Sequence, residues 1–535
     1  MSARPSFLRA ALRGSAPRTG RDRPRRRTFR SLLWALAAVL LFSQGALADE
    51  ELVKEFRKYF RKFKDVPTRV EAVMALHGEQ SLAVVEAMLP ILKDPEPEVV
   101  QAAVKVLGAF KERPPIDALV ARLAEEKDDV VRLGILDAFA VGGYTGTSEG
   151  LFACLEDKGW EVRHRAIVAL AAAGDPGAAE RIVPSAAAKE PPARCAALEA
   201  LGVLGSPLGV EPAIAALADP EWQVRASAIA TLGKVRDKRS IGPLIDLLER
   251  EEGRLQVDAA ASLGALTGRS FGLRKELWRN FWNTYADRYE LPSDEEMAKL
   301  RERQAAIKES YRPTGAVAYH GIETPSRSIL FVIDVSGSME DEVVEHERFA
   351  DGEYPSMRRI DIVKTELART IEGLEDYVEF NVLAFATEVD PWKKSQVKAN
   401  VLNKKSALDW VSGLQAIGGA SKQDLARNGL TGAANLEAGK TNTYGALMKA
   451  LDAESEEKRR KTGDYDIGID TVFFLSDGRP SHGEFTVPED ILREVKAMNE
   501  LRKVVIHTIA IGQFQKSFMQ TLAEQNGGTF VDLGK

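Results

Sequence analysis

The first half of the chain repeats one pattern of apolar and polar positions about every 31 residues. In each copy the fifth position is Ala or Ile and the ninth is Leu or Phe, so the apolar residues share one face of a helix. An earlier amphipathic segment, such as 116–125 or 241–250, precedes the copy. The pattern predicts about seven helix pairs that stack into an all-α solenoid over residues 50–270. The seven copies begin at Thr68, Val99, Val131, Val162, Ala193, Val224 and Leu255.

Acidic residues and prolines separate the two helices of a pair, at residues 94–95, 128–129 and 219–220. Aspartate there can cap the following helix, and proline is tolerated in its first turn. Five copies also carry arginine at their second position, which indicates salt bridges between repeats or, alternatively, a basic ladder that binds a ligand. These arginines are Arg69, Arg132, Arg163, Arg194 and Arg225.

Residues 271–315 have a different character. Five aromatic residues lie close together in them, which predicts a cap on the exposed end of the solenoid, with a carbohydrate-binding platform as the alternative. Residues 293–311 are charged and read as a surface helix that links the two halves. The aromatic residues are Trp278, Phe281, Trp282, Tyr285 and Tyr289.

From residue 327 onward, short apolar runs alternate with amphipathic helical patterns. The runs at 328–333, 378–386, 470–476, 504–512 and 528–534 are typical of strands buried on both faces. The helical patterns lie at 360–374, 406–414, 444–451, 489–501 and 517–525. This alternation predicts a mainly parallel sheet with helices on both faces, an α/β domain at residues 316–535.

The N-terminus has the three parts of a secretory signal peptide. Ten arginines in residues 1–30 precede the apolar run 32–42, and Ala46-Leu47-Ala48 gives a small-x-small cleavage pattern. We therefore expect a signal peptide at 1–48 and an exported protein, periplasmic, in the cell envelope or secreted. The apolar run is shorter than the roughly 20 residues that span a bilayer, so no membrane span is expected after cleavage. A retained anchor and an organelle transit peptide are the alternatives.

Charge and cysteine content narrow the function further. Without residues 1–48 the chain has 63 basic and 78 acidic residues, a formal charge of −15, which disfavours nucleic acid as a partner. The only cysteines, Cys154 and Cys195, are too few for a disulfide scaffold. They are expected to be buried as small apolar residues, with a single bridge between them as the alternative.

Oxygen donors gather where predicted strands end. Asp334, Ser336 and Ser338 follow the run 328–333, Asp477 follows 470–476, and Thr441 opens a helix. In parallel α/β sheets, ligands bind outside the carboxyl ends of the strands. Carboxylates and hydroxyls without His or Cys favour Mg²⁺, with Mn²⁺ or Ca²⁺ as alternatives, over zinc or copper.

These motifs carry a family resemblance. The sequences DVSGSM (334–339), TNTY (441–444) and LSDG (475–478) resemble the three loops of a von Willebrand factor type A domain. The resemblance implies a Rossmann-like fold and a metal-ion-dependent adhesion site. Its metal ligands would be Asp334, Ser336, Ser338, Thr441 and Asp477. A partner's Asp or Glu would complete the coordination of the cation.

Other parts of the resemblance are less specific. Thr443 is the fallback ligand for Thr441, since the family often has Gly-Gly-Thr where this chain has Gly-Lys-Thr at 439–441. The helix pairs of the first half resemble short HEAT-like repeats, and repeats of this size also resemble those of bilin lyases, which would be enzymes.

Two long segments flank the predicted site, at 340–358 and 416–440. They read as solvated surface loops. Alternatively they set partner choice, or the carboxylate of Glu342 or Glu345 occupies the open metal position as an internal plug.

The leading hypothesis is an exported, non-catalytic adhesion protein that binds a protein partner through the metal. The helical repeats would be a scaffold or a second surface for another protein. A structural scaffold in which the metal only stabilises the fold is the second hypothesis, and a metal-dependent hydrolase is the third. We expect no enzyme, because the six histidines form no H-E-x-x-H arrangement. Of the six, only His482 follows Asp477 closely in the sequence, so it is the histidine that could approach the metal.

Overall fold

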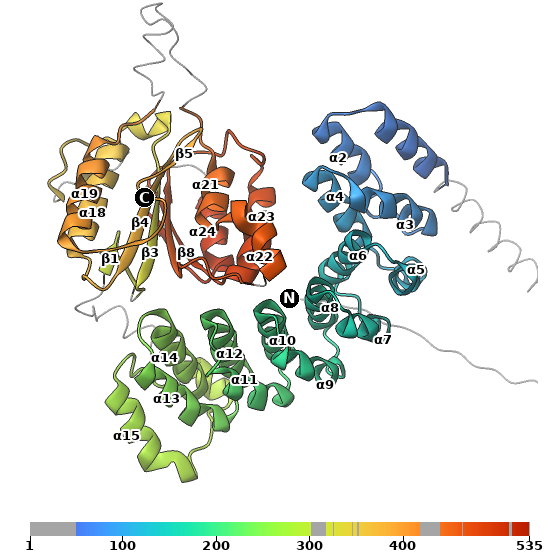
Figure 1. Ribbon diagram of the computed structural model, residues 1–535, viewed down its shortest axis with the longest axis horizontal. Coiled ribbons are helices and arrows are strands. Elements are labelled where there is room, and N and C mark those ends of the chain that lie inside the picture. Colours follow the sequence, from blue (N-terminus) through green and yellow to red (C-terminus); the bar gives the residue numbers. More distant parts are fainter. Residues whose placement is uncertain are drawn as a thin grey trace, which may run out of the picture.

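A computed structural model of the protein shows an arc of paired helices and an α/β domain (Figure 1). The structure describes residues 50–300, 317–324, 326–344, 346–349, 352–417, 439–462, 464–512 and 516–533. The predicted signal peptide and the end of the predicted linker helix lie outside these ranges. We call residues 50–267 the repeat arm and residues 317–533 the α/β domain.

The repeated segments form the inner helices of the arm, as predicted. From the second copy onward, their fifth and ninth positions lie fully buried between neighbouring helices, for example Ala166 and Leu170 at 0% exposure, while Ala72 of the first copy is half-buried. The small fifth residue lets the next inner helix pack closely. The inner helices are α2 (Val66–Met74), α4 (Pro97–Leu107), α6 (Asp129–Gly142), α8 (Trp160–Ala173), α10 (Pro191–Val203), α12 (Trp222–Val235) and α14 (Arg254–Thr267).

Most of the outer helices are shorter, and several continue as a 3-10 segment. Pro90 and Pro184 lie in the first turn of two such segments, Leu89–Lys93 and Val183–Ala187, where proline has no N–H to continue an α-helix. The outer helices are α3 (Leu82–Met88), α5 (Arg113–Glu125), α7 (Ser148–Phe152), α9 (Ala178–Ile182), α11 (Val210–Ala216) and α13 (Ile241–Arg250).

The recurring arginines join successive repeats, as the salt-bridge interpretation predicts. Each reaches an acidic residue in the turn of the next repeat. The pairs are Arg69–Asp94, Arg132–Asp157 (2.6 Å), Arg163–Glu190 (2.6 Å), Arg194–Asp219 (2.8 Å) and Arg225–Glu251 (3.3 Å). Asp94 and Asp219 also accept a backbone N–H two residues on, so they fix the turn instead of capping the helix directly.

The aromatic segment covers the end of the arm. Helix α15 (Lys275–Tyr285) places Trp278 at 0% exposure in the same apolar cluster as α13 and α14. Phe281 meets the rings of Trp282, Tyr285 and Tyr289 at centroid distances of 5.1–6.4 Å. Trp278 and Phe281 are thus used in packing against the last repeat, as a cap would require, while Tyr285 is 40% exposed.

In the described part of this domain, the predicted strand–helix alternation forms one mixed sheet of seven strands. Its order is β5-β4-β3-β7-β8-β9, with β6 also paired to β4. The adjacent strands β4, β3, β7, β8 and β9 run parallel to one another, while β5 and β6 are antiparallel to β4. The strands are β3 (Ser328–Asp334), β4 (Glu379–Phe385), β5 (Val389–Pro391), β6 (Val397–Lys398), β7 (Thr471–Ser476), β8 (Val505–Ala510) and β9 (Phe530–Asp532). A separate hairpin of β1 (Val317–Tyr319) and β2 (Ile322–Thr324) was not predicted.

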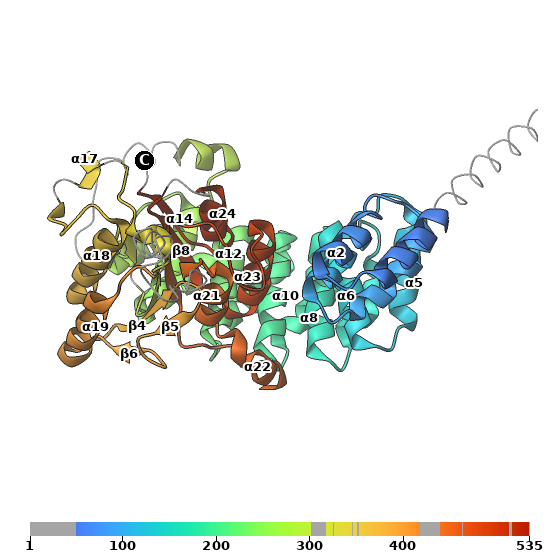
Figure 2. The ribbon, with the colours of Figure 1, turned by 90° about the horizontal axis from the view of Figure 1, so that it is seen from above.

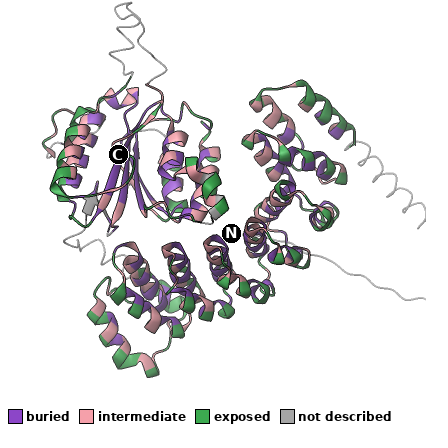
Figure 3. Ribbon diagram, in the orientation of Figure 1, coloured by how far each residue is buried: buried purple, intermediate pink, exposed green. Residues whose placement is uncertain are grey.

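Helices cover both faces of this sheet (Figure 1). Alternate residues of β3 enter two apolar cores: Phe331 packs toward α18 and α19, and Val332 toward α21, α23 and α24. The sheet is therefore buried on both faces, as the continuous apolar runs predict (Figure 3). The helices are α17 (His346–Phe349), α18 (Arg359–Gly373), α19 (Val401–Gly413), α21 (Thr443–Ala450), α22 (Glu456–Thr462), α23 (Pro488–Arg502) and α24 (Lys516–Gln525).

The α/β domain rests against the inner helices of the arm, chiefly through α23 and the loops beside it (Figures 1 and 2). The contact is rich in charge, with ion pairs from Glu199 to Lys503 at 2.6 Å and from Arg165 to Glu500 at 3.3 Å. Gln101 hydrogen bonds Glu494 in the middle of α23, and Arg254 donates to the carbonyl of Lys503 just after the helix. The arm thus holds its own α/β domain, a use of the solenoid surface that periodicity alone does not predict.

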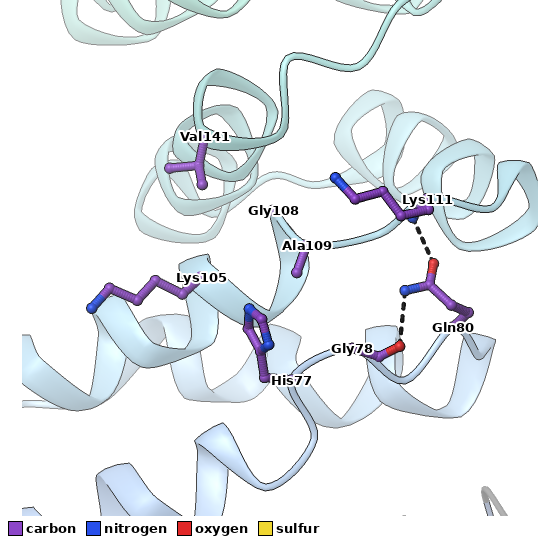
Figure 4. Close-up of a pocket in the computed structure, with 8 residues that line it drawn as sticks. All are labelled: His77, Gly78, Gln80, Lys105, Gly108, Ala109, Lys111 and Val141. Carbon is purple, nitrogen blue, oxygen red and sulfur yellow. Dashed lines mark hydrogen bonds between the residues drawn. The ribbon is translucent and has the colours of Figure 1, made fainter. Parts of the chain in front are cut away.

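A groove of about 510 Å³ lies near the N-terminal repeats, lined by residues that include His77, Lys105 and Val141 (Figure 4). Gln80 bridges its floor, accepting from the N–H of Lys111 at 2.6 Å and donating to Gly78 at 3.0 Å. These groups satisfy one another and join two repeats, so we assign the groove no ligand.

Both cysteines are buried and unpaired, which agrees with their prediction as small apolar residues. Among the described residues, no helix combines the length and apolar character needed to cross a membrane.

Candidate metal centre

The predicted site residues meet at one edge of the sheet, where β3 and β7 end. Asp334 is the last residue of β3, and Asp477 follows directly after β7. The two strands are parallel neighbours, so their carboxyl ends bring both carboxylates together. From β3 the chain runs to β4 on one side, while β7 lies on the other, and this reversal is where open α/β sheets bind ligands.

The carboxylate of Asp334 is fully buried and held by two donors. Its Oδ1 accepts the N–H of Ser336 at 2.8 Å, and its Oδ2 accepts the hydroxyl of Ser476 at 2.5 Å. Burial and the neighbouring charge of Asp477 raise the pKa of Asp334 above its usual range. The carboxylate is therefore fixed in place and would gain from a nearby cation.

The carboxylate of Asp477 accepts hydrogen bonds from two other segments, the loop after β3 and the start of α18. Its Oδ1 accepts the hydroxyl of Ser338 at 2.7 Å, and its Oδ2 accepts Nη1 of Arg359 at 2.6 Å. The hydroxyls of Ser336 and Ser338 lie 3.3 Å apart. Burial raises the pKa of Asp477, although Ser338 and Arg359 act in the opposite direction.

Thr441 approaches the same place from the loop before α21. A Cβ added to Gly478 would lie 2.9 Å from the Thr441 hydroxyl and 3.5 Å from Asp334 Oδ2, so both oxygens border Gly478. The loop is anchored because the Thr441 carbonyl accepts the N–H of Ser481 at 3.0 Å. Thr443 is 1% exposed, and its hydroxyl has no hydrogen-bond partner among the described residues, so it remains the alternative ligand.

The flanking segments are partly described. Glu342 pairs with His346 at 3.5 Å and is 63% exposed, whereas Glu345 and residues 418–438 lie outside the described ranges. The plug hypothesis therefore stays a prediction. His482 is half-buried beside the site, and its backbone N–H donates to the Thr441 carbonyl at 3.3 Å.

The donor set fits a hard divalent cation in chemical type. Two buried carboxylates lie beside three hydroxyls, and such oxygen donors suit Mg²⁺, Mn²⁺ or Ca²⁺. The described residues contain no cluster of three His, Cys, Asp or Glu side chains that could hold a metal, so hydroxyls would have to supply the remaining protein ligands.

Two contributors were not predicted from the sequence. Ser476 directly precedes Asp477 and anchors Asp334, and its place within the LSDG motif was the available signal. Arg359 contacts Asp477 from the start of α18. The signal for Arg359 is its position: a cation in the first turn of a helix opposes the helix dipole.

Known sequences and structures match the two halves separately. The family described as HEAT repeats matches residues 35–140, 148–212 and 210–270, and the von Willebrand factor type A domain matches residues 327–532. In the human inter-alpha-trypsin inhibitor heavy chain H4, 215 residues are 28% identical, which is 39% of this chain and 18% of that protein. Human von Willebrand factor A domain-containing protein 3A is 26% identical over 207 residues, 38% of this chain and 13% of the relative.

The matched region thus spans less than a fifth of these relatives. Among solved structures, BatB from Bacteroides thetaiotaomicron covers 38% of this chain and 89% of its own, at 11% identity and a TM-score of 0.24. Its similarity is too low to carry an argument. The family matches, the helix pairs and the sheet order agree with one another. The chain is a von Willebrand factor type A domain protein with N-terminal HEAT repeats.

Proposed function

We propose that this chain is an exported, non-catalytic protein that binds a protein partner through a divalent cation, Mg²⁺ foremost. The ligands are Asp334, Ser336, Ser338, Thr441 and Asp477. The observation that carries the proposal is the pair of buried carboxylates, Asp334 and Asp477, held at the sheet edge by the hydroxyls of Ser476 and Ser338.

The residues have separate roles. Asp334 supplies the fixed charge at the end of β3, and Ser476 and the Ser336 N–H hold its orientation. Ser336, Ser338 and Thr441 supply neutral oxygens. Two carboxylates only balance the charge of a divalent cation, and the other proposed ligands are neutral, so the cation can still take a carboxylate from a partner.

The arm acts as a scaffold for this site. Its inner helices hold α23, the helix between β7, which leads into Asp477, and β8. The arm therefore presents the α/β domain in one orientation, and its outer surface remains for a second protein.

Thermal melts of the full chain test the metal. The melts are recorded in chelator and then in Mg²⁺, Mn²⁺ or Ca²⁺. A ligand at 100 times its Kd stabilises the folded state by about 2.7 kcal/mol, which raises Tm. We expect this rise for the wild type and for Asp409→Asn, an exposed aspartate of α19, and none for Asp334→Asn. An equal rise in Asp334→Asn would refute the site.

Proton relaxation of water around bound Mn²⁺ separates adhesion from a purely structural metal. An open coordination position holds exchangeable water, and a peptide with a glutamate side chain should displace it and lower the relaxation rate. A bound Mn²⁺ whose water signal is absent from the start would favour the scaffold hypothesis.

A further inference from the structure

Arg359 lies between two carboxylates of different character. Its Nη1 is 2.6 Å from Oδ2 of Asp477, whose side chain is 0% exposed, and 3.7 Å from Oδ2 of Asp341, whose side chain is 58% exposed. The same nitrogen donates to the carbonyl of Ser338 at 3.2 Å. The guanidinium therefore touches two of the proposed ligand residues and has an acidic partner on its outward side.

The helix α18 itself does not favour a cation at this position. Arg359 is the first residue of α18, where the dipole of the helix disfavours positive charge. Its Nε is buried without a hydrogen-bond partner among the described residues. Both features cost stability, and the contacts with Asp477, Asp341 and the Ser338 carbonyl offset that cost.

We infer that Arg359 is a built-in competitor of the divalent cation, a positioning residue that sets how much metal the site requires. The inference rests on the proposed metal site. A guanidinium on Asp477 neutralises one of the two anionic ligands, and it repels a second cation nearby. Metal binding then requires Arg359 to leave Asp477, and Asp341 offers it a carboxylate on the surface.

This competition couples the metal to the segment around it. The N–H of Arg359 donates to the Asp341 carbonyl at 3.0 Å, so a shift of the side chain acts on the start of α18 and on the segment that follows Ser338. A change at the metal would thus reach the flanking segment 340–358.

Titration calorimetry of the full chain with Mn²⁺ tests the inference. Arg359→Gln removes the charge but keeps a polar side chain that can donate hydrogen bonds, and it should tighten Mn²⁺ binding by about tenfold or more. The matched control is Arg358→Gln, because Arg358 is 47% exposed and pairs with Asp361 at 2.8 Å. It should bind Mn²⁺ as the wild type does.

Asp341→Asn gives a second, independent readout on the exposed side. It removes the outward partner of Arg359, so Mn²⁺ should bind more weakly than to the wild type. If the wild type binds Mn²⁺ while Arg359→Gln matches Arg358→Gln, or Asp341→Asn has no effect, the competition is overturned and the site stands. If neither the wild type nor Arg359→Gln binds Mn²⁺, the proposed site fails and the inference fails with it.

Discussion

Replacing Lys503 by Met should loosen the α/β domain from the arm. Lys503 follows α23, and its Nζ lies 2.6 Å from Oε1 of Glu199 on α10. Methionine keeps the unbranched shape and most of the length of the lysine side chain but removes the charge. Glu199 and the nearby Glu500 would then face each other across the contact without this cation.

The cost follows from the burial of the pair. Breaking a fully buried ion pair by removing one partner costs about 3–5 kcal/mol. Glu199 is 33% exposed and still accepts the hydroxyl of Ser227 at 2.7 Å, so we expect a loss near 2 kcal/mol after allowance for solvent screening. For a domain of this size that loss lowers Tm by about 4–8 °C.

Calorimetry and hydrogen exchange measure the effect. The matched control is Lys496→Met, which removes a positive charge from an exposed position of the same helix and should leave Tm almost unchanged. Exchange of the α23 amides should accelerate in Lys503→Met alone. Equal Tm values and equal exchange in the two variants would refute the docking of α23 on the arm.

Three further predictions follow from single residues. Gly478→Ala should weaken Mn²⁺ binding without unfolding the chain, since the new Cβ would press 2.9 Å from the Thr441 hydroxyl; unchanged affinity in calorimetry would contradict this placement. Burial and the charge of Arg254 lower the pKa of His507 from 6.5 to about 4. Stability is then fully present above pH 6.5 and is lost as pH falls toward 4, by up to about 3 kcal/mol. Urea titrations of His507→Gln should show a smaller loss of stability over this pH range. An equal loss would show that a group other than His507 takes up the proton. Trp278→Ala should cost about 3–5 kcal/mol in urea denaturation by opening a cavity under the cap, and a cost below about 1 kcal/mol would show that the cap does not support the arm.

The parts of the fold with a local period were predictable from the sequence. The 31-residue spacing placed the inner helices, and α13 spans Ile241–Arg250 as its amphipathic pattern indicated. The apolar runs placed the strands, because a strand buried on both faces needs apolar residues at successive positions. The short strands of the β1–β2 hairpin were missed because three residues give no readable period.

Contacts between distant segments were not predictable in the same way. The sequence motifs predicted the five candidate ligands, but nothing local connects Arg359 to Asp477, 118 positions away. The contact between Gln101 and Glu494 joins positions 393 apart. Such pairs depend on how the arm and the sheet are placed in space, which neither helical periodicity nor strand patterning encodes.

The most direct test of the central claim is a crystal structure of the full chain grown with Mn²⁺, with diffraction measured for its anomalous signal. The account predicts one strong anomalous peak among the oxygens of Asp334, Ser336 and Ser338, with Thr441 or Thr443 beside it. A peak at another place on the molecule, or none at this edge of the sheet in a well-ordered crystal, would contradict the metal-dependent binding site.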